Sequence, residues 1–190
     1  MTFDTPNAEG LRALEARLAE DFVRLNHPPT DWSPETKAPD NRPVADVLII
    51  GGGMNGLCAA FALRRLGISN IRHIDARDAG QEGPWLTFAR MEFLRSPKHL
   101  TGPAQGIANL SFRAWWEAQY GPAGWDQLGY ILREDWASYL AWYGRVTGSQ
   151  IENATKLTAL TPGPDHVTCQ IETPKGPDEV LARQVVLATG

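Results

Sequence analysis

The stretch that decides the fold is Val47-Leu48-Ile49-Ile50-Gly51-Gly52-Gly53-Met54-Asn55-Gly56, an apolar β-type run that ends in the pattern Gly-x-Gly-x-x-Gly. The three glycines of this pattern have separate physical roles. Gly51 permits the tight turn off the strand, and Gly53 lacks the Cβ that would keep a ligand away from the backbone. Gly56 allows the following helix, expected over 57–66, to pack closely on the sheet.

The segments that follow this turn fit the same design. Residues 57–66 carry an apolar face of alanines and leucines, and Gly67 is placed to end the helix. A second strand-like segment, 71–74, leads into Asp75, which follows Gly51 at close to the interval of about 20 residues typical of an acid that binds adenosine ribose. This order predicts a dinucleotide site rather than a structural glycine turn followed by an ordinary surface aspartate.

The predicted site places the ligand's pyrophosphate against unpaired N–H groups at the positive end of the helix. The residues expected around the ligand are those of the turn, the acid and the residue after it: Gly51, Gly52, Gly53, Met54, Asn55, Gly56, Asp75 and Ala76. His73 precedes the acid on the same strand, where a core or sheet-surface histidine is favoured over a catalytic one.

Composition limits the other functions of this 190-residue chain. It is 43% hydrophobic and 21% charged, values typical of a globular protein, and its net charge of −4 argues against nucleic-acid binding. No apolar run approaches the roughly 20 residues of a membrane span, and the N-terminus lacks the layout of a signal peptide. The two cysteines match no metal-ligand spacing. These features predict a cytoplasmic protein without a metal site.

Residues 1–42 are predicted to form an N-terminal arm. Leucines and a phenylalanine recur at spacings of three and four over 11–25, which indicates one amphipathic helix, and the proline-rich segment 27–43 indicates an extended linker. We expect the arm to pack on the body of the protein or on a partner subunit of a homo-oligomer.

Residues 43–190 are predicted to form one α/β domain of the Rossmann type, with a parallel sheet, a helical insertion and a small antiparallel β-meander. The expected parallel strands are 44–50, 71–75 and 184–188. The expected insertion helices are 111–120, ended by Gly121-Pro122, and 134–146; the expected meander strands are 155–160, 166–172 and 179–183. Because the sequence stops directly after a core strand, before any covering helix, we expect a fragment of a longer protein.

Four features resemble the N-terminal part of the two-dinucleotide flavoprotein monooxygenases, a group that includes flavin-containing monooxygenases, Baeyer–Villiger enzymes and N-hydroxylases. They are the glycine motif at 51–56, Asp75, the turn 80–85 that ends in Trp85, and the strand 186–190 that ends in Ala-Thr-Gly. The resemblance covers residues 44–190. It implies that the glycine motif binds FAD and that Trp85, Thr189 and Gly190 also contact this cofactor.

The same resemblance extends to the segment 91–103, which is similar to the part that passes the flavin ring in N-hydroxylases. It implies a role for Lys98 beside the flavin, although Lys98, Arg95 and His99 fit a solvated loop equally well. The family's second glycine motif does not occur here, so the resemblance places the site for NADPH or NADH outside this chain. It implies monooxygenation of a small molecule with no catalytic side chain assigned, because the cofactor carries the reactivity.

Two other functions use the same glycine turn. An NAD(P)-dependent dehydrogenase would share the turn and the acid, but the long irregular stretch 76–133 argues against it, because simple dehydrogenases return to a third strand sooner. A non-catalytic dinucleotide-binding module would need only the turn, and the missing second glycine motif leaves that interpretation open.

Overall fold

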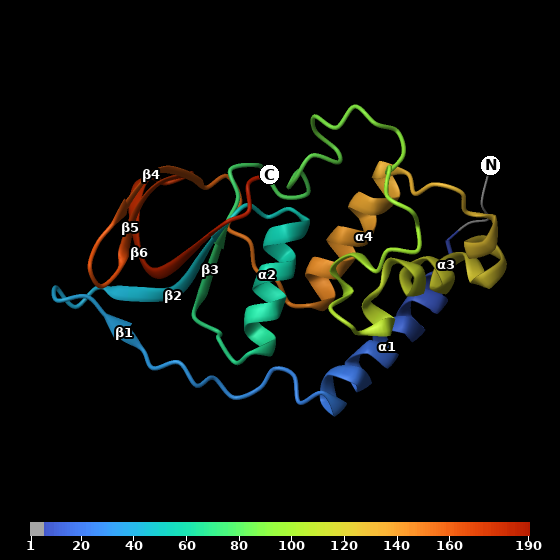
Figure 1. Cartoon of the computed structure of the whole chain (residues 1–190), viewed down its shortest axis with the longest axis horizontal. Helices are drawn as coiled ribbons and strands as arrows, with labels where there is room; N and C mark the ends of the chain where they lie inside the picture. Colours follow the sequence, from blue (N-terminus) through green and yellow to red (C-terminus); the bar gives the residue numbers. More distant parts are fainter. Residues whose placement is uncertain (1–5) are drawn as a thin grey trace.

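The computed structural model describes residues 6–190 and shows a sheet at one end, a group of helices at the other, and α2 between them (Figure 1). The helices are α1 (Ala8–Arg24), α2 (Met54–Arg65), α3 (Phe112–Gln127) and α4 (Arg133–Val146), with short 3₁₀ turns at Gly102–Ala104 and Ala108–Leu110. The strands are β1 (Thr36–Lys37), β2 (Pro43–Ile50), β3 (Ile71–Ile74), β4 (Lys156–Pro162), β5 (Val167–Thr173) and β6 (Gly176–Leu187).

The sheet confirms the predicted α/β fold with a parallel part and an antiparallel meander. β2 is parallel to β3 and to β6, with Ile49 level with His73 on one side and with Val186 on the other. Strands β6, β5 and β4 continue the sheet as antiparallel neighbours. The carboxyl ends of β2 and β3, and the end of β6, therefore meet at one edge, which is where α/β sheets place their ligands.

Strand β2 is buried on both faces, as its continuous apolar run predicts. One face packs Val47 and Ile49 against Ala60 of α2, and the opposite face packs Leu48 and Ile50 against the meander. The helix is thereby fixed directly over the strand that precedes it, and the turn between them is held from both sides.

Three predicted boundaries differ from the structure. The segments 179–183 and 184–188 are one strand, β6, which pairs with β5 in its first half and with β2 in its second. The helix that begins after the N-cap Ser111 leaves helical geometry at Gly121, as predicted, with φ 71° and ψ 173°, but beyond this kink a further helical segment from Pro122 to Gln127 completes α3. Proline favours such a restart because its fixed φ suits the first helical turn. The proline-rich linker contains β1, which pairs with β2.

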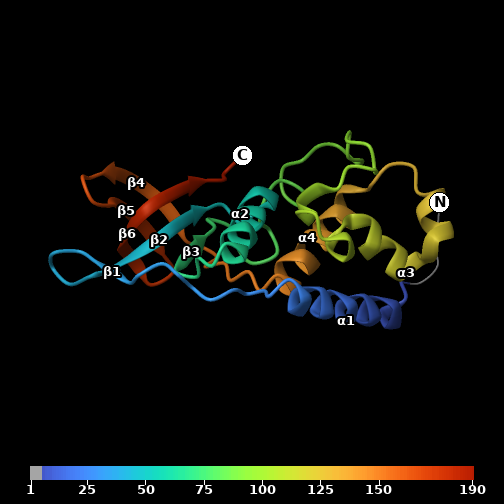
Figure 2. The same ribbon diagram turned by 60° about the horizontal axis from the view of Figure 1, so that its bottom comes forward.

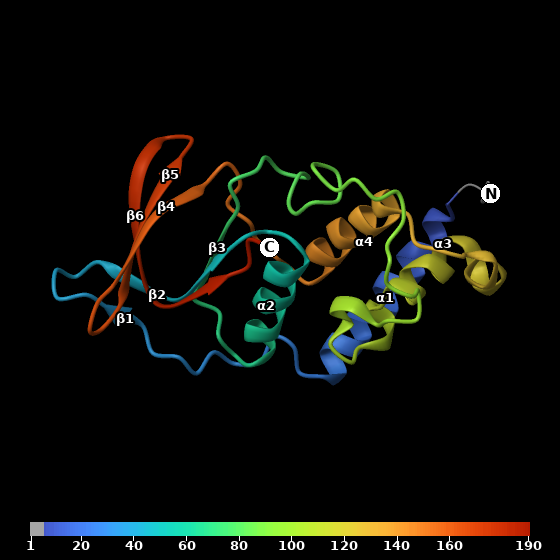
Figure 3. The same cartoon turned by 45° about the horizontal axis from the view of Figure 1, so that its top comes forward.

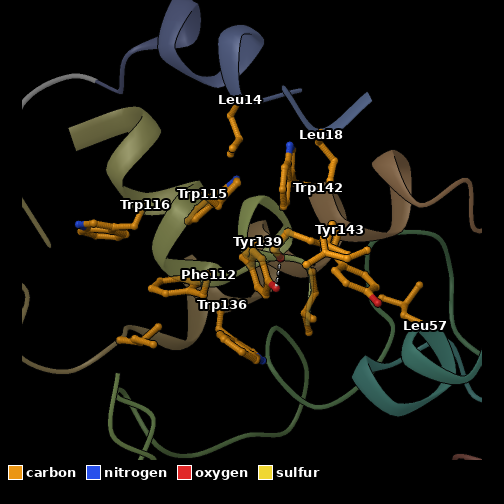
Figure 4. Packing of buried hydrophobic residues seen from close by; sticks show 14 of the residues in the cluster. Leu14, Leu18, Leu57, Phe112, Trp115, Trp116, Trp136, Tyr139, Trp142 and Tyr143 are labelled. Atoms are coloured by element: carbon orange, nitrogen blue, oxygen red, sulfur yellow. Dashed lines mark hydrogen bonds between the residues drawn. The ribbon is translucent and has the colours of Figure 1, made fainter. Parts of the chain in front are cut away.

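The largest core lies among the helices and is rich in aromatic side chains. Figure 4 shows Phe112 and Trp115 of α3 facing Tyr139 of α4, whose hydroxyl donates to the Leu110 carbonyl at 2.8 Å. Trp115, Trp116, Trp136 and Trp142 are all 6% exposed or less, so these four side chains fill the core that α3 and α4 share.

The helix of the N-terminal arm packs on the body of the same chain, the first of the two alternatives. Leu14 and Leu18 of α1 enter the aromatic core and are 0% and 1% exposed. Figure 2 shows α1 running beneath α3 and α4. The division at residue 42 and a homo-oligomer formed through the arm stay predictions. Of the helices within residues 6–190, none has the length and apolarity that crossing a bilayer requires.

An ion pair that joins α1 to α4 gives the stability a defined pH dependence. Glu15 accepts a hydrogen bond from Arg145 at 2.5 Å and another from the Trp142 indole at 3.1 Å. The Arg145 guanidinium holds the pKa of Glu15 below the ordinary glutamate value of 4.5. A carboxylate whose pKa is lower in the folded state stabilises the fold above that value, and this contribution is lost as the pH falls further.

We expect Glu15→Gln to lower the free energy of unfolding by about 0.5–1 kcal/mol at pH 7, because the partly exposed pair is screened by solvent. The difference from the unmodified protein should shrink as the pH is lowered through the depressed pKa of Glu15 and should vanish at an acidic pH at which this carboxylate is protonated. Urea unfolding at the two pH values measures it. A difference that is equal at both would show that the charge of Glu15 does not stabilise this contact.

Candidate functional site

A cavity of about 920 Å³ lies at the carboxyl edge of β2, β3 and β6. It brings together predicted site residues from four separate segments of the sequence. The predicted residues that line it are Gly51, Gly53, Met54, Asn55, Asp75, Ala76, Trp85, Thr189 and Gly190. Figure 3 shows why the last two belong here, since the end of β6 carries the chain to the N-terminal end of α2.

The first and last glycines of the motif build the turn by close approach of backbones. Gly51 has φ +112°, and a Cβ there would lie 2.5 Å from the Ala188 carbonyl oxygen. A Cβ on Gly56 would overlap the Gly51 carbonyl oxygen and would lie 2.8 Å from His73 Nε2. A side chain at Gly51 would push away the backbone that follows β6, and a side chain at Gly56 would push α2 away from the turn after β2.

The N-terminus of α2 opens into the cavity without a cap of its own. Gly53 is the N-cap residue, no side chain caps the helix, and the first turn holds no acidic residue. The first N–H groups of a helix have no partner inside it and carry its positive partial charge. Gly53 itself leaves room, because the nearest atom to an added Cβ would be the Gly83 Cα at 3.4 Å. This corner is an open anion-binding position.

Gly52, the second of the three consecutive glycines, does not line this cavity, although the sequence predicts that it contacts the ligand. The Gly52 N–H donates to Asp75 Oδ2 at 2.6 Å, and the position of its absent Cβ faces Glu82 and Ile151 rather than the large cavity. Gly52 and Gly56 therefore shape the turn from behind, whereas Gly53, Met54 and Asn55 line the cavity.

Asp75 lines the cavity beside the glycine turn and is held in place by the backbone around it. Its N–H donates to the Glu152 carbonyl, its own carbonyl accepts from the Thr155 N–H, and its Oδ1 accepts from the Arg77 N–H at 2.7 Å. The residue is 7% exposed. Because a carboxylate oxygen can accept two hydrogen bonds, each oxygen of Asp75 keeps capacity for a ligand hydroxyl.

The cavity also contains charged and aromatic residues that the sequence reasoning missed. Arg77 and Lys156 line it together with Phe88, so that two cations and one carboxylate face the same space. This balance favours a ligand with more than one negative charge. Arg77 could have been inferred from its position two residues after Asp75, but nothing in the sequence joins Lys156 to this edge.

Trp85 and Lys98 are both predicted to contact the cofactor, but only Trp85 lines the cavity. Trp85 lines the cavity and meets Trp136 edge-on, with ring centroids 6.3 Å apart, so it links the glycine turn to the aromatic core. Lys98 is not brought to the cavity. Its ammonium group donates to the Trp125 and Leu128 carbonyls at 2.6 and 2.5 Å, because the C-terminal end of α3 presents unpaired carbonyl oxygens to a nearby cation.

Replacing Asp75 by alanine should weaken FAD binding by about 10- to 100-fold, because a hydrogen bond to a charged group contributes about 1.5–3 kcal/mol. The change also leaves the Gly52 and Arg77 N–H groups without their carboxylate partner. Asp75→Asn keeps one acceptor oxygen and should fall between alanine and the unmodified protein. Titration of the apoprotein with FAD measures the dissociation constant, and an unchanged value for alanine would remove Asp75 from the site.

Comparison with known proteins agrees with this geometry. Residues 48–190 match the family described as FAD-NAD(P)-binding, which is most of the chain and all of the cavity. The chain belongs to this family. Within residues 6–190 of this FAD-NAD(P)-binding protein, no group of three or more histidine, cysteine, aspartate or glutamate side chains is placed to hold a metal ion.

Individual relatives of this FAD-NAD(P)-binding protein are flavin enzymes. The chain is 43% identical over 180 residues to the FAD-dependent urate hydroxylase of Xanthomonas campestris pv. campestris, and the match covers 95% of this chain and 38% of the relative. A flavin-containing monooxygenase from Stenotrophomonas maltophilia is 27% identical, with a TM-score of 0.55 over 77% of this chain and 38% of that one. The ornithine N-hydroxylase of Kutzneria sp. 744 is 23% identical with a TM-score of 0.61 over 78% of this chain and 38% of that one, which shows a shared fold.

Proposed function

We propose that this chain is the FAD-binding portion of an NAD(P)H-linked monooxygenase that hydroxylates a small organic molecule. The observation that carries the proposal is the uncapped N-terminus of α2, which opens into a cavity that the buried Asp75 also lines. The chain spans about 38% of the length of the urate hydroxylase that it matches. The proposed activity is therefore that of a longer protein, to which these residues contribute the FAD-binding portion.

The cavity offers a separate position to each part of FAD. The N–H groups at Gly53, Met54 and Asn55 suit the pyrophosphate, for which a helix N-terminus is a favourable partner. Asp75, followed by Ala76, suits the hydroxyls of the adenosine ribose. Arg77 and Lys156 add positive charge at the ribose side of the cavity.

The remaining lining residues suit the flavin half of the cofactor. Trp85 and Phe88 provide aromatic surface, while Thr189 and Gly190 bring the end of the chain against the glycine turn. Bound FAD supplies the redox and oxygen chemistry, and the described residues bind it, orient it and exclude water from it. The proposal includes a cytoplasmic location, which the two free cysteines support.

Purification of the full-length protein tests this function. We expect a yellow protein whose visible absorbance bleaches when NADPH or NADH is added without oxygen. Urate is the first substrate to assay, because the relative with 43% identity is named for it. A colourless protein that gains thermal stability from NAD would favour a dehydrogenase, and a colourless protein that responds to neither cofactor would favour a non-catalytic module. Both results would contradict the proposal.

A further inference from the structure

A buried histidine lies directly behind the glycine turn. His73 of β3 is 3% exposed, and its Nε2 is 2.9 Å from the Gly51 carbonyl oxygen. It lies on the same face of β3 as Ile71, which packs in the apolar cluster beneath α2. An apolar residue would suit this position by packing alone, so the imidazole needs a separate reason.

The hydrogen bond fixes the state of the ring. A carbonyl oxygen only accepts, so Nε2 carries the proton and donates it to Gly51. The other ring nitrogen, Nδ1, is buried without a hydrogen-bond partner among residues 6–190. A second proton on Nδ1 would place an unpartnered donor and a charge in the interior. The imidazole is therefore neutral, with its hydrogen on the atom that faces the turn.

The charged groups around the imidazole of His73 do not change its neutral state. Burial lowers the pKa of His73 most strongly, and Arg64 of α2 adds to the lowering. Asp75 and Glu82 act in the opposite direction, as does the contact with Gly51. Since the net pKa is below the ordinary histidine value of 6.5, the ring stays uncharged at neutral pH.

We propose that His73 is a positioning residue for the dinucleotide site, because its Nε2–H holds the Gly51 carbonyl and so fixes the turn that aims the N-terminus of α2 into the cavity. This inference rests on the proposed function. At Gly51, with φ +112°, the chain leaves β2 and turns toward α2. The Gly51 carbonyl is also the group against which Gly56 of α2 packs. Without the donor, this part-buried carbonyl loses its hydrogen bond, and the peptide units up to Gly53 can rotate.

Three variants separate positioning from packing. His73→Phe keeps a ring of similar shape but cannot donate. His73→Gln carries an amide N–H at about the reach of Nε2 and can restore the donor. Ile71→Ala is the matched control, because it removes apolar contact from the same face of β3 without touching the turn.

The test measures the dissociation constants of FAD and ADP with the full-length apoprotein at neutral pH, beside the free energy of unfolding of each variant. We expect His73→Phe to weaken both ligands about tenfold, His73→Gln to stay within about threefold of the unmodified protein, and Ile71→Ala to lose stability while binding normally. ADP reports the turn and the ribose position at Asp75 without any contribution from the flavin, which it lacks.

The inference is overturned if His73→Phe binds both ligands normally, if glutamine is as weak as phenylalanine, or if Ile71→Ala weakens binding equally. In each of these cases the unmodified protein still binds FAD and ADP, so the proposed function stands. Failure of the unmodified protein to bind either ligand would overturn both proposals together.

Discussion

Replacing Gly53 by valine is expected to leave the chain folded and to weaken FAD binding by at least about a hundredfold, so that the protein is purified without flavin. The backbone at Gly53, with φ −70° and ψ −174°, is extended and suits a β-branched residue. The nearest atom to an added Cβ is 3.4 Å away. The valine methyl groups would instead occupy the space through which a pyrophosphate reaches the first N–H groups of α2.

Gly129→Val is the matched control for this prediction. Nothing lies within 4 Å of a Cβ added at Gly129, and this glycine is outside both the turn and the lining of the cavity. It should retain flavin at the level of the unmodified protein. The ratio of flavin to protein after purification measures both variants, with circular dichroism to confirm folding. Full flavin content in folded Gly53→Val would rule out close approach of the ligand at this residue.

Replacing Gly56 by alanine is expected to lower the free energy of unfolding by about 3 kcal/mol or more. The added methyl group would overlap the Gly51 carbonyl oxygen, which is backbone and cannot move aside without separating α2 from β2. Loss of flavin should follow from loss of the fold, in contrast to Gly53→Val. Denaturant unfolding of the apoprotein measures this loss in the free energy of unfolding.

Gly144→Ala provides the contrast in another helix. A Cβ on Gly144 of α4 would lie 3.2 Å from Leu57 Cδ2, the end of a side chain that can adjust. Alanine also favours the helix over glycine by up to about 1 kcal/mol, so this variant should be neutral or slightly stabilised. Equal stability losses at Gly56 and Gly144 would mean that the tight strand–helix contact is not the reason for glycine at position 56.

The parts of this protein that could be predicted from sequence are those governed by local backbone requirements. The glycine turn, β2, the N-cap Ser111 and the acid at the end of β3 each follow from a short pattern with one physical cause. The segment of α3 beyond Gly121 was missed because Gly121-Pro122 reads equally as an end and as a restart of a helix. The single strand β6 was missed because its two halves pair with different partners.

The site was predictable only where neighbours in space are also neighbours in sequence. Lys98 lies within the segment 91–103 that resembles a flavin-contacting one, but the carbonyls that hold it belong to the end of α3, whose place no local pattern reveals. Lys156 reaches the cavity because the chain just before it pairs with the backbone at Asp75, a contact between segments about 80 residues apart. The sequence predicts a core or a sheet-surface histidine at position 73, and its burial shows that the first alternative holds, but its bond to Gly51 could not be foreseen without the folded turn.

A crystal structure of the protein with FAD bound would show directly where the diphosphate lies. We predict that its oxygens lie within hydrogen-bond distance, about 2.7–3.2 Å, of the backbone nitrogens at the start of α2, with the adenosine ribose beside Asp75. A diphosphate bound elsewhere, with Gly53 and Met54 facing only water, would contradict it.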